Sequence, residues 1–160
     1  MKRVFALLFS LLFASTSLAS DDTVVRWRNI VGVITAPGVS NTVAGINSGG
    51  LPWTVAVGKA RVDLYTGAAV FFVEGLVLVG GNASGTPGPV TSVKGTLVCN
   101  PGSTTIQAVI DTPAVPLNAQ GNADFYGNLL SIPPSTCANP LFLIRVAPAD
   151  VWIATGASRT

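Results

Sequence analysis

The chain alternates apolar and polar side chains in two segments, in the manner of β-strands. Residues Lys59–Tyr65 (KARVDLY) alternate strictly, and Thr105–Asp111 do so with one exception at Val109. A period of two places one set of side chains against a core and the other in water. Both segments therefore predict half-buried strands.

Apolar, β-branched runs predict the remaining strands. They are Val24–Ile34, Trp53–Val57, Ala69–Val79, Val90–Val98, Ala123–Leu130, Leu141–Val146 and Val151–Ala154. Clusters rich in Gly, Pro, Asn and Ser separate them, at Pro37–Gly50, Gly80–Pro89, Asn100–Ser103, Thr112–Gln120 and Pro133–Pro140. After the N-terminal segment, no window combines helical apolar spacing with freedom from Gly and Pro. The pattern predicts an all-β protein of about nine strands.

Short strands joined by turns predict a single-domain antiparallel β-sandwich, with a closed β-barrel as the alternative. The continuous apolar run AAVFFVEGLVLVGG favours the sandwich, since it suits a strand covered on both faces. Gly75, in the middle of this run, predicts a bulge or a bend.

Residues 1–19 (MKRVFALLFSLLFASTSLA) have the pattern of a secretory signal peptide. Lys2 and Arg3 precede the apolar run Val4–Phe13, and Ser17-Leu18-Ala19 offers small residues at both cleavage-specifying positions. The run is shorter than the roughly 20 residues that span a bilayer, so we expect no integral membrane anchor. We expect one β domain over residues 20–160, in the periplasm or outside the cell.

Charge is sparse and, without the signal peptide, balanced. The chain has nine basic and seven acidic residues, and removal of Lys2 and Arg3 leaves seven of each. Zero net charge gives no reason to expect a nucleic acid partner. Charged residues are 10% of the chain, which favours self-association or a protein or glycan partner.

The chain has two cysteines, Cys99 and Cys137, and both follow the predicted signal peptide. In an oxidising compartment such a pair is normally bridged. We therefore predict one disulfide, which would pin the Pro-rich loop 133–140 to a strand end.

The absence of histidine restricts the chemistry of the protein. It excludes Ser-His-Asp and Cys-His catalysis and the usual imidazole sites for zinc or copper. We expect no metal, no cofactor and no catalytic residues. Gly80–Pro89 also lacks the lysine and the following helix of a phosphate-binding loop.

Two charges stand in apolar surroundings and are candidates for burial. Glu74 lies between AAVFFV and GLVLVGG, and Arg145 lies in LFLIRVAP. If buried, each would need a partner, and they could pair with one another. A solvent-facing Glu74 beside a bulge and a structural Arg145 are the alternative.

Tryptophans are the candidate ligand contacts. Trp27 stands between Arg26 and Arg28, and arginines beside an aromatic ring could bind a carboxylate. Trp53 follows the loop GINSGGLP and is the better candidate for a surface contact. Core packing is the alternative for both and for Trp152.

These observations predict an exported, non-enzymatic binding or interaction module. One alternative is a carbohydrate-active hydrolase or lyase, which needs two carboxylates facing one cleft. The candidates are Asp63, Glu74, Asp111, Asp124 and Asp150, with Asp21 and Asp22 near the predicted start. A small outer-membrane barrel and a carrier of an apolar ligand are further alternatives. Asn82-Ala83-Ser84 matches the N-glycosylation pattern, which matters only in a host that glycosylates exported proteins.

Overall fold

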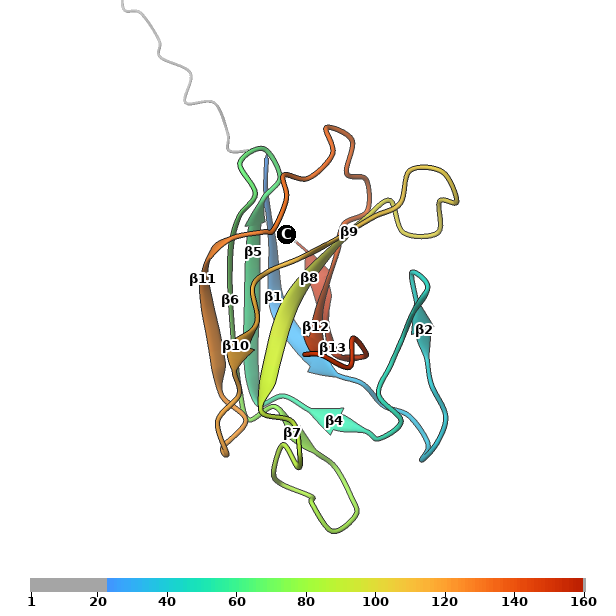
Figure 1. The fold of residues 1–160 in the computed structure, drawn as a ribbon, viewed down its shortest axis with the longest axis vertical. Coiled ribbons are helices and arrows are strands. Elements are labelled where there is room, and N and C mark those ends of the chain that lie inside the picture. Colours follow the sequence, from blue (N-terminus) through green and yellow to red (C-terminus); the bar gives the residue numbers. More distant parts are fainter. Residues whose placement is uncertain (1–22, 160) are drawn as a thin grey trace, which may run out of the picture.

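The computed structural model describes residues 23–159, and in this range the protein is all-β, as predicted (Figure 1). The predicted signal peptide, Asp21 and Asp22 lie outside the described residues. The described strands are β1 (Val24–Gly32), β2 (Thr42–Val43), β3 (Ile46–Asn47), β4 (Trp53–Thr54), β5 (Val57–Asp63), β6 (Ala68–Glu74), β7 (Val77–Leu78), β8 (Ser92–Cys99), β9 (Ala108–Asp111), β10 (Val115–Pro116), β11 (Ala123–Asn128), β12 (Leu141–Val146) and β13 (Trp152–Arg159).

One large antiparallel sheet carries the fold. Its strand order is β10-β8-β12-β13-β1-β5-β6-β11, and β9 also pairs with β8. The sheet curls so that its end strands, β10 and β11, approach one another without pairing (Figure 1). The predicted two-sheet sandwich is not confirmed, and the barrel alternative is realised only as an open half-barrel.

Aromatic rings fill the inside of the curl. The rings of Trp27 and Phe142 are 5.3 Å apart, those of Phe71 and Phe125 5.8 Å, and those of Phe71 and Phe142 5.9 Å. The four residues come from β1, β6, β11 and β12, so the cluster joins both walls of the half-barrel. The two-residue period of each strand directs these side chains inward.

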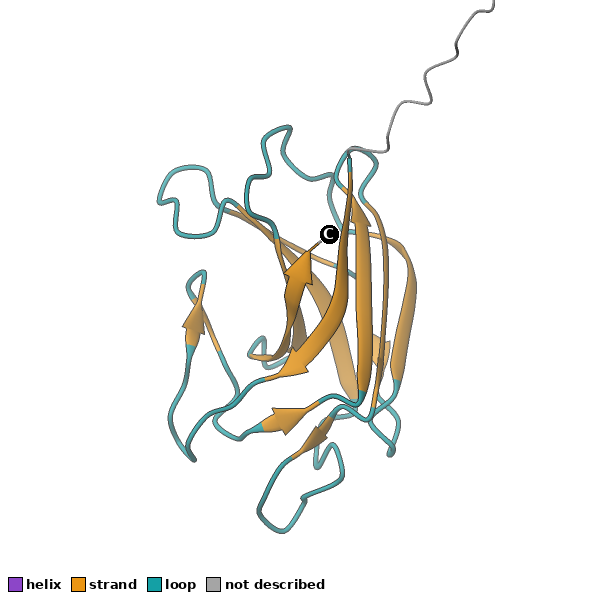
Figure 2. Cartoon of the chain, turned by 180° about the vertical axis from the view of Figure 1, so that it is seen from behind, coloured by secondary structure: helices purple, strands orange, loops and turns teal. Residues whose placement is uncertain are grey.

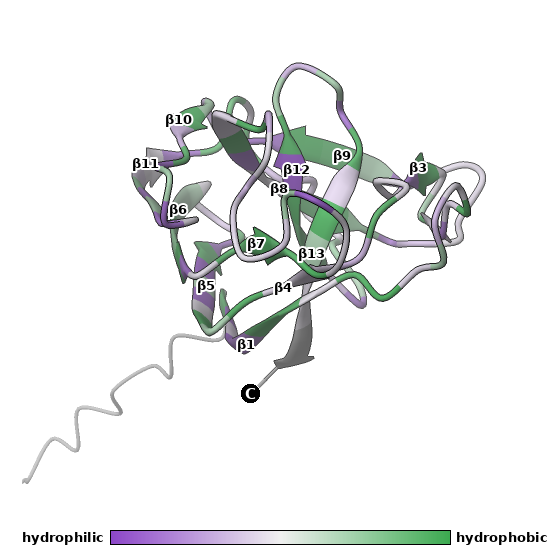
Figure 3. Ribbon diagram, turned by 90° about the horizontal axis from the view of Figure 1, so that it is seen from below, coloured by the Kyte–Doolittle hydropathy of each residue, from purple (hydrophilic) through white to green (hydrophobic). Residues whose placement is uncertain are grey.

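Two short strand pairs, β4–β7 and the β2–β3 hairpin, pack against the large sheet. Strands β4 and β7 pair with each other and lie across one end of the half-barrel (Figure 3). The β2–β3 hairpin projects beside β12 and β13 (Figure 2), where the Trp152 indole N–H donates to the Asn41 carbonyl at 3.1 Å. In this hairpin, the side chains of Val43, Ala44 and Ile46 pack against the core.

Several predicted segments differ from the observed strands. The strand predicted over Thr105–Asp111 is observed only as Ala108–Asp111, and β10 lies in the predicted loop Thr112–Gln120. The run Ala69–Val79 divides at Gly75, where φ is +63° and an added Cβ would lie 3.0 Å from the Ala56 Cβ. Gly75 therefore ends β6, in keeping with the predicted bend. The β2–β3 hairpin lies in a segment predicted to be a loop, because its strands of two residues each are too short to produce a period.

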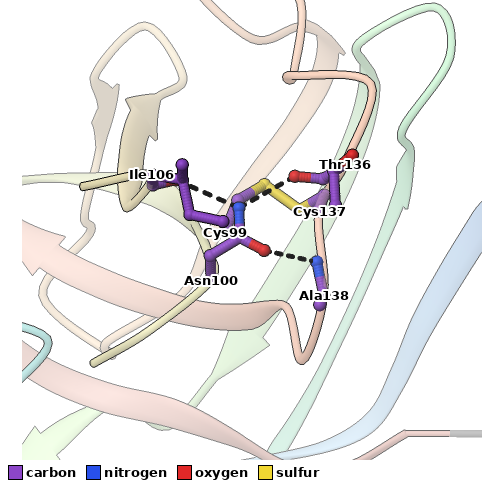
Figure 4. Close-up of a disulfide and its surroundings, with 6 residues drawn as sticks. All are labelled: Cys99, Asn100, Ile106, Thr136, Cys137 and Ala138. Carbon is purple, nitrogen blue, oxygen red and sulfur yellow. Dashed lines mark hydrogen bonds between the residues drawn. A yellow bond between two sulfur atoms is a disulfide. The ribbon is translucent and has the colours of Figure 1, made fainter. Parts of the chain in front are cut away.

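The predicted disulfide between Cys99 and Cys137 is confirmed (Figure 4). Beside it, the buried Asn100 side chain donates to the carbonyls of Ile106 and Thr136 at 3.0 and 2.8 Å. Asn100 Oδ1 also accepts a hydrogen bond from the Ala138 N–H at 2.8 Å. The disulfide and the amide together hold loop 133–140 against the end of β8.

Within residues 23–159, no helix has the length and apolar character needed to cross a membrane.

Gly95 tests the aromatic packing. A Cβ at this position in β8 would lie 2.6 Å from Phe142 Cζ and 2.9 Å from Phe71 Cδ1. We expect Gly95→Ala to lower the free energy of unfolding by about 1–3 kcal/mol, because both rings must shift. Chemical denaturation measures this loss. Gly50→Ala is the control, since its nearest atoms lie at 3.8 Å, and equal losses in both variants would contradict the packing argument.

Reduction tests the disulfide. The bridged residues are 38 positions apart, so we expect dithiothreitol to lower the free energy of unfolding by about 4 kcal/mol through the larger entropy of the open chain. Urea denaturation with and without reductant measures the change. The Cys99→Ala/Cys137→Ala variant should be insensitive to the reductant, and an unchanged midpoint for the wild type would refute the prediction.

Candidate functional site

The outer face of strands β1, β5, β6 and β11 collects exposed positive charge. Arg26 lies directly opposite Arg61 in the β1–β5 pairing, and Lys59 is two residues before Arg61 on the same face of β5. All three side chains are exposed. The alternating pattern of β5 directs Ala60 and Val62 into the core and leaves its charges outside.

Arg28, two residues after Arg26 in β1, adds a fourth cation to this face, as the two-residue period of the strand requires. The pairing of β1 with β13 then shifts register between Trp27 and Asn29 and again before Ile30. This bulge exposes Asn29 next to Arg28 and returns Ile30 to the core beside Trp27. A β-bulge commonly redirects a side chain in this way. We call the four side chains of Arg26, Arg28, Lys59 and Arg61 the basic cluster.

The basic cluster surrounds a hollow with an apolar floor. The hollow has a volume of about 270 Å³, and its other lining residues are Trp27, Ala60, Val70 and Phe72. Val70 and Phe72 are half-buried, so part of each side chain remains accessible. The site can therefore contact an apolar surface and pair with anionic groups on its rim.

A second hollow adjoins the first on the same face. It measures about 280 Å³ and shares Arg61 and Val70 with the first hollow. Its further lining includes Asp63 at the end of β5 and Tyr126 and Asn128 of β11. Tyr126 is 88% exposed although it lies in the middle of a strand. A row of side chains thus runs across four strands, from Arg26 through Arg61 and Val70 to Tyr126.

Asp63 supplies a negative charge to the second hollow. Its Oδ1 accepts hydrogen bonds from the backbone N–H groups of Tyr65 at 2.9 Å and Thr66 at 3.3 Å. Desolvation acts to raise the pKa of Asp63, but these hydrogen bonds prevail, and its pKa lies below the usual value. Asp63 is therefore a carboxylate at neutral pH.

Two other cations, Lys94 and Arg145, take part in an ion-pair network on β8, β9 and β12. Lys94 Nζ lies 2.7 Å from Asp111 Oδ2 and also contacts Asp150. Arg145 is 8% exposed; its Nη1 lies 3.1 Å from Asp111 Oδ1, and it donates two hydrogen bonds to the Asp150 carbonyl. Thr96 donates to Asp111 Oδ1 at 2.7 Å.

The network shifts two pKa values. The hydrogen bond from Lys94 lowers the pKa of Asp150, and desolvation partly opposes it. Desolvation acts to lower the pKa of Lys94, but the hydrogen bonds with Asp111 and Asp150 prevail, so its pKa is raised. Both groups are therefore held in their charged forms.

The structure separates the two residues predicted as buried charges. Arg145 is buried and paired with Asp111 and Asp150, whereas Glu74 is exposed at the end of β6. A buried Glu74 paired with Arg145 is therefore wrong, because the outward positions of β6 face water. Asp124 of β11 is also exposed, and neither it nor Glu74 lines the hollows of this face.

Tryptophans are structural in this fold. Trp27, Trp53 and Trp152 are 1%, 6% and 5% exposed. Burial removes Trp27 and Trp53 as stacking surfaces for a ligand, since their rings pack inward. Trp53 still forms part of the wall of an apolar groove of about 420 Å³, together with Leu51, Leu78 and Ile153.

The sequence pattern predicts Arg26 and Arg28 as candidate ligand contacts but does not single out Lys59, Arg61 or Tyr126, which the structure places on the same face. The alternation in Lys59–Tyr65 already placed Lys59 and Arg61 on one outer face. Only the strand order brings that face beside Arg26 and Tyr126.

No family model, curated protein or solved structure matches the chain. The function must therefore be argued from the geometry of the chain itself.

The ion-pair network on β8, β9 and β12 predicts that the free energy of unfolding depends on pH in the acid range. Because the pKa of Asp150 is lower in the folded state, its contribution is complete above the ordinary carboxyl pKa of about 4 and is lost as the pH falls through the lowered value. We expect Asp150→Asn to lower stability at pH 7 and to weaken this dependence. Asparagine tolerates the φ of +60° at this position.

Urea denaturation between pH 7 and pH 2.5 (roughly the acid range of a paired carboxylate) measures the difference. Asp124→Asn is the control, because this exposed carboxylate lies outside the network and should leave the wild-type profile unchanged. Identical pH profiles for Asp150→Asn and the wild type would contradict the role of Asp150.

Proposed function

We propose that this protein is a non-enzymatic binding module that holds an anionic ligand on the basic cluster. The observation that carries the proposal is the gathering of Arg26, Arg28, Lys59 and Arg61 around one apolar-floored hollow. The balanced charge of the chain therefore conceals a local cluster of basic side chains.

The pairing of Arg26 with Arg61 supports a role in binding. Like charges directly opposite one another on two strands destabilise a sheet. An anionic ligand between the two guanidinium groups would turn this repulsion into an attraction.

Export fits this proposal. The signal-peptide pattern of residues 1–19 favours a protein that works outside the cytoplasm, and the Cys99–Cys137 disulfide is compatible with an oxidising compartment. Exported proteins meet anionic polymers at cell surfaces, and such polymers are suitable ligands for a basic face.

The alternative functions have weaker support. A hydrolase needs two carboxylates across a cleft, but Glu74 and Asp124 lie exposed on the outer face and line neither hollow there. A carrier of an apolar ligand needs space inside the curl, which the rings of Trp27, Phe71 and Phe142 fill.

Charge removal tests the proposed function. We expect Arg26→Gln/Arg61→Gln to weaken binding of dextran sulfate at least tenfold, because two charge-assisted contacts are lost. Isothermal titration calorimetry measures the dissociation constant. Wild-type affinity should also fall as NaCl rises from about 0.05 to 0.5 M, where screening becomes strong.

Arg26→Lys/Arg61→Lys is the matched control, since it keeps the charge and should retain most of the affinity. Neutral dextran of the same length should not bind the wild type. Equal affinities of the glutamine variant and the wild type for dextran sulfate would rule out the basic cluster as the ligand site.

A further inference from the structure

We infer that the ligand is an acidic polysaccharide in which a charged sugar occupies the basic cluster and a neutral sugar occupies the adjoining hollow at Tyr126. This inference rests on the proposed function and names its ligand class. It follows from the contrast between two neighbouring hollows on one face.

The two hollows form one continuous track. They share Arg61 and Val70, and the row from Arg26 to Tyr126 crosses β1, β5, β6 and β11. Adjacent strands lie about 4.8 Å apart, so the row extends over about 14 Å. A ligand that uses both hollows must therefore be longer than a single sugar ring.

The first hollow suits a ring that carries a carboxylate or sulfate. Its rim holds the four cations of the basic cluster, and its floor presents the accessible parts of Val70 and Phe72. A sugar ring has an apolar face of C–H groups that could lie on this floor. Its acidic group could then pair with the arginines, which bind planar anions through two parallel hydrogen bonds.

The second hollow suits a neutral, hydroxylated ring. Tyr126 offers an exposed aromatic ring for stacking, and Asn128 offers an amide donor and acceptor. The carboxylate of Asp63 can accept hydrogen bonds from hydroxyl groups, but it repels a second anionic group. Arg61 lines both hollows, and the other three cations line only the first. The positive charge therefore lies at one end of the track and Asp63 at the other.

Other polyanions fit this arrangement less well. A nucleic acid carries a phosphate on every unit, so one of its charges would lie beside Asp63. An extended acidic peptide binds most readily to the free edge of a sheet, whereas this track crosses the face of paired strands. A polymer of alternating charge matches both hollows.

Three hexasaccharides test the inference by titration calorimetry. One alternates glucuronate with N-acetylglucosamine, one is all galacturonate, and one is neutral chitohexaose. We expect the alternating oligomer to bind most tightly, because only it can place a charged ring on the basic cluster and a neutral ring beside Asp63. A single-stranded DNA hexamer and hexaglutamate are the comparison polyanions, and tighter binding of either would overturn the glycan assignment.

Tyr126→Ala isolates the second hollow. We expect it to weaken binding of the alternating hexasaccharide about tenfold, through loss of stacking. Tyr65→Ala is the matched control, because Tyr65 is also a highly exposed tyrosine but lines neither hollow. Asp63→Asn should improve binding of the all-galacturonate oligomer.

The outcomes separate the two proposals. If Arg26→Gln/Arg61→Gln weakens dextran sulfate binding but Tyr126→Ala leaves the alternating hexasaccharide unaffected, the assignment of the second hollow is wrong and the basic cluster remains the ligand site. If the arginine variant changes the affinity for no anionic probe, the proposed function itself is wrong.

Discussion

The fold depends on the contact between aromatic rings inside the curled sheet. Phe142 of β12 contacts Trp27 of β1 and Phe71 of β6, which lie two and four places away in the strand order, and these contacts bring the two walls together. Phe125 of the neighbouring β11 stacks on Phe71. Gly95 makes these contacts possible, because a side chain on β8 would occupy the space of two rings. With the rings in place, each strand has a defined inner and outer face.

The outer faces of the two walls differ in how their charged side chains are arranged. On β8, β9 and β12, the charges of Lys94, Asp111 and Arg145 are paired and partly buried. Breaking a buried pair costs about 3–5 kcal/mol, whereas an exposed pair contributes about 0–1 kcal/mol. This network therefore serves mainly stability. On β1 and β5, exposed cations of like sign lie together, which favours interaction with a ligand.

The proposed binding track is a product of strand order. Arg26, Arg61 and Tyr126 are separated by dozens of residues in the chain, yet they occupy one row because β1, β5, β6 and β11 are neighbours in the sheet. Within a strand, every second side chain lies on the same face of the sheet. The pairing register then decides which side chains of neighbouring strands lie side by side. A rigid sheet face holds such a row in place with little loss of entropy on binding.

The sequence by itself determined the all-β class, the disulfide and the outward position of Lys59 and Arg61, because these depend on local periodicity and on the presence of a single cysteine pair. It also indicated the break at Gly75. Tertiary structure decided that one sheet curls into a half-barrel, that Trp53 is buried, and that Arg145 pairs with Asp111 rather than with Glu74. These outcomes depend on which strands become neighbours, and strand pairing is a long-range choice on which a period of two carries no information.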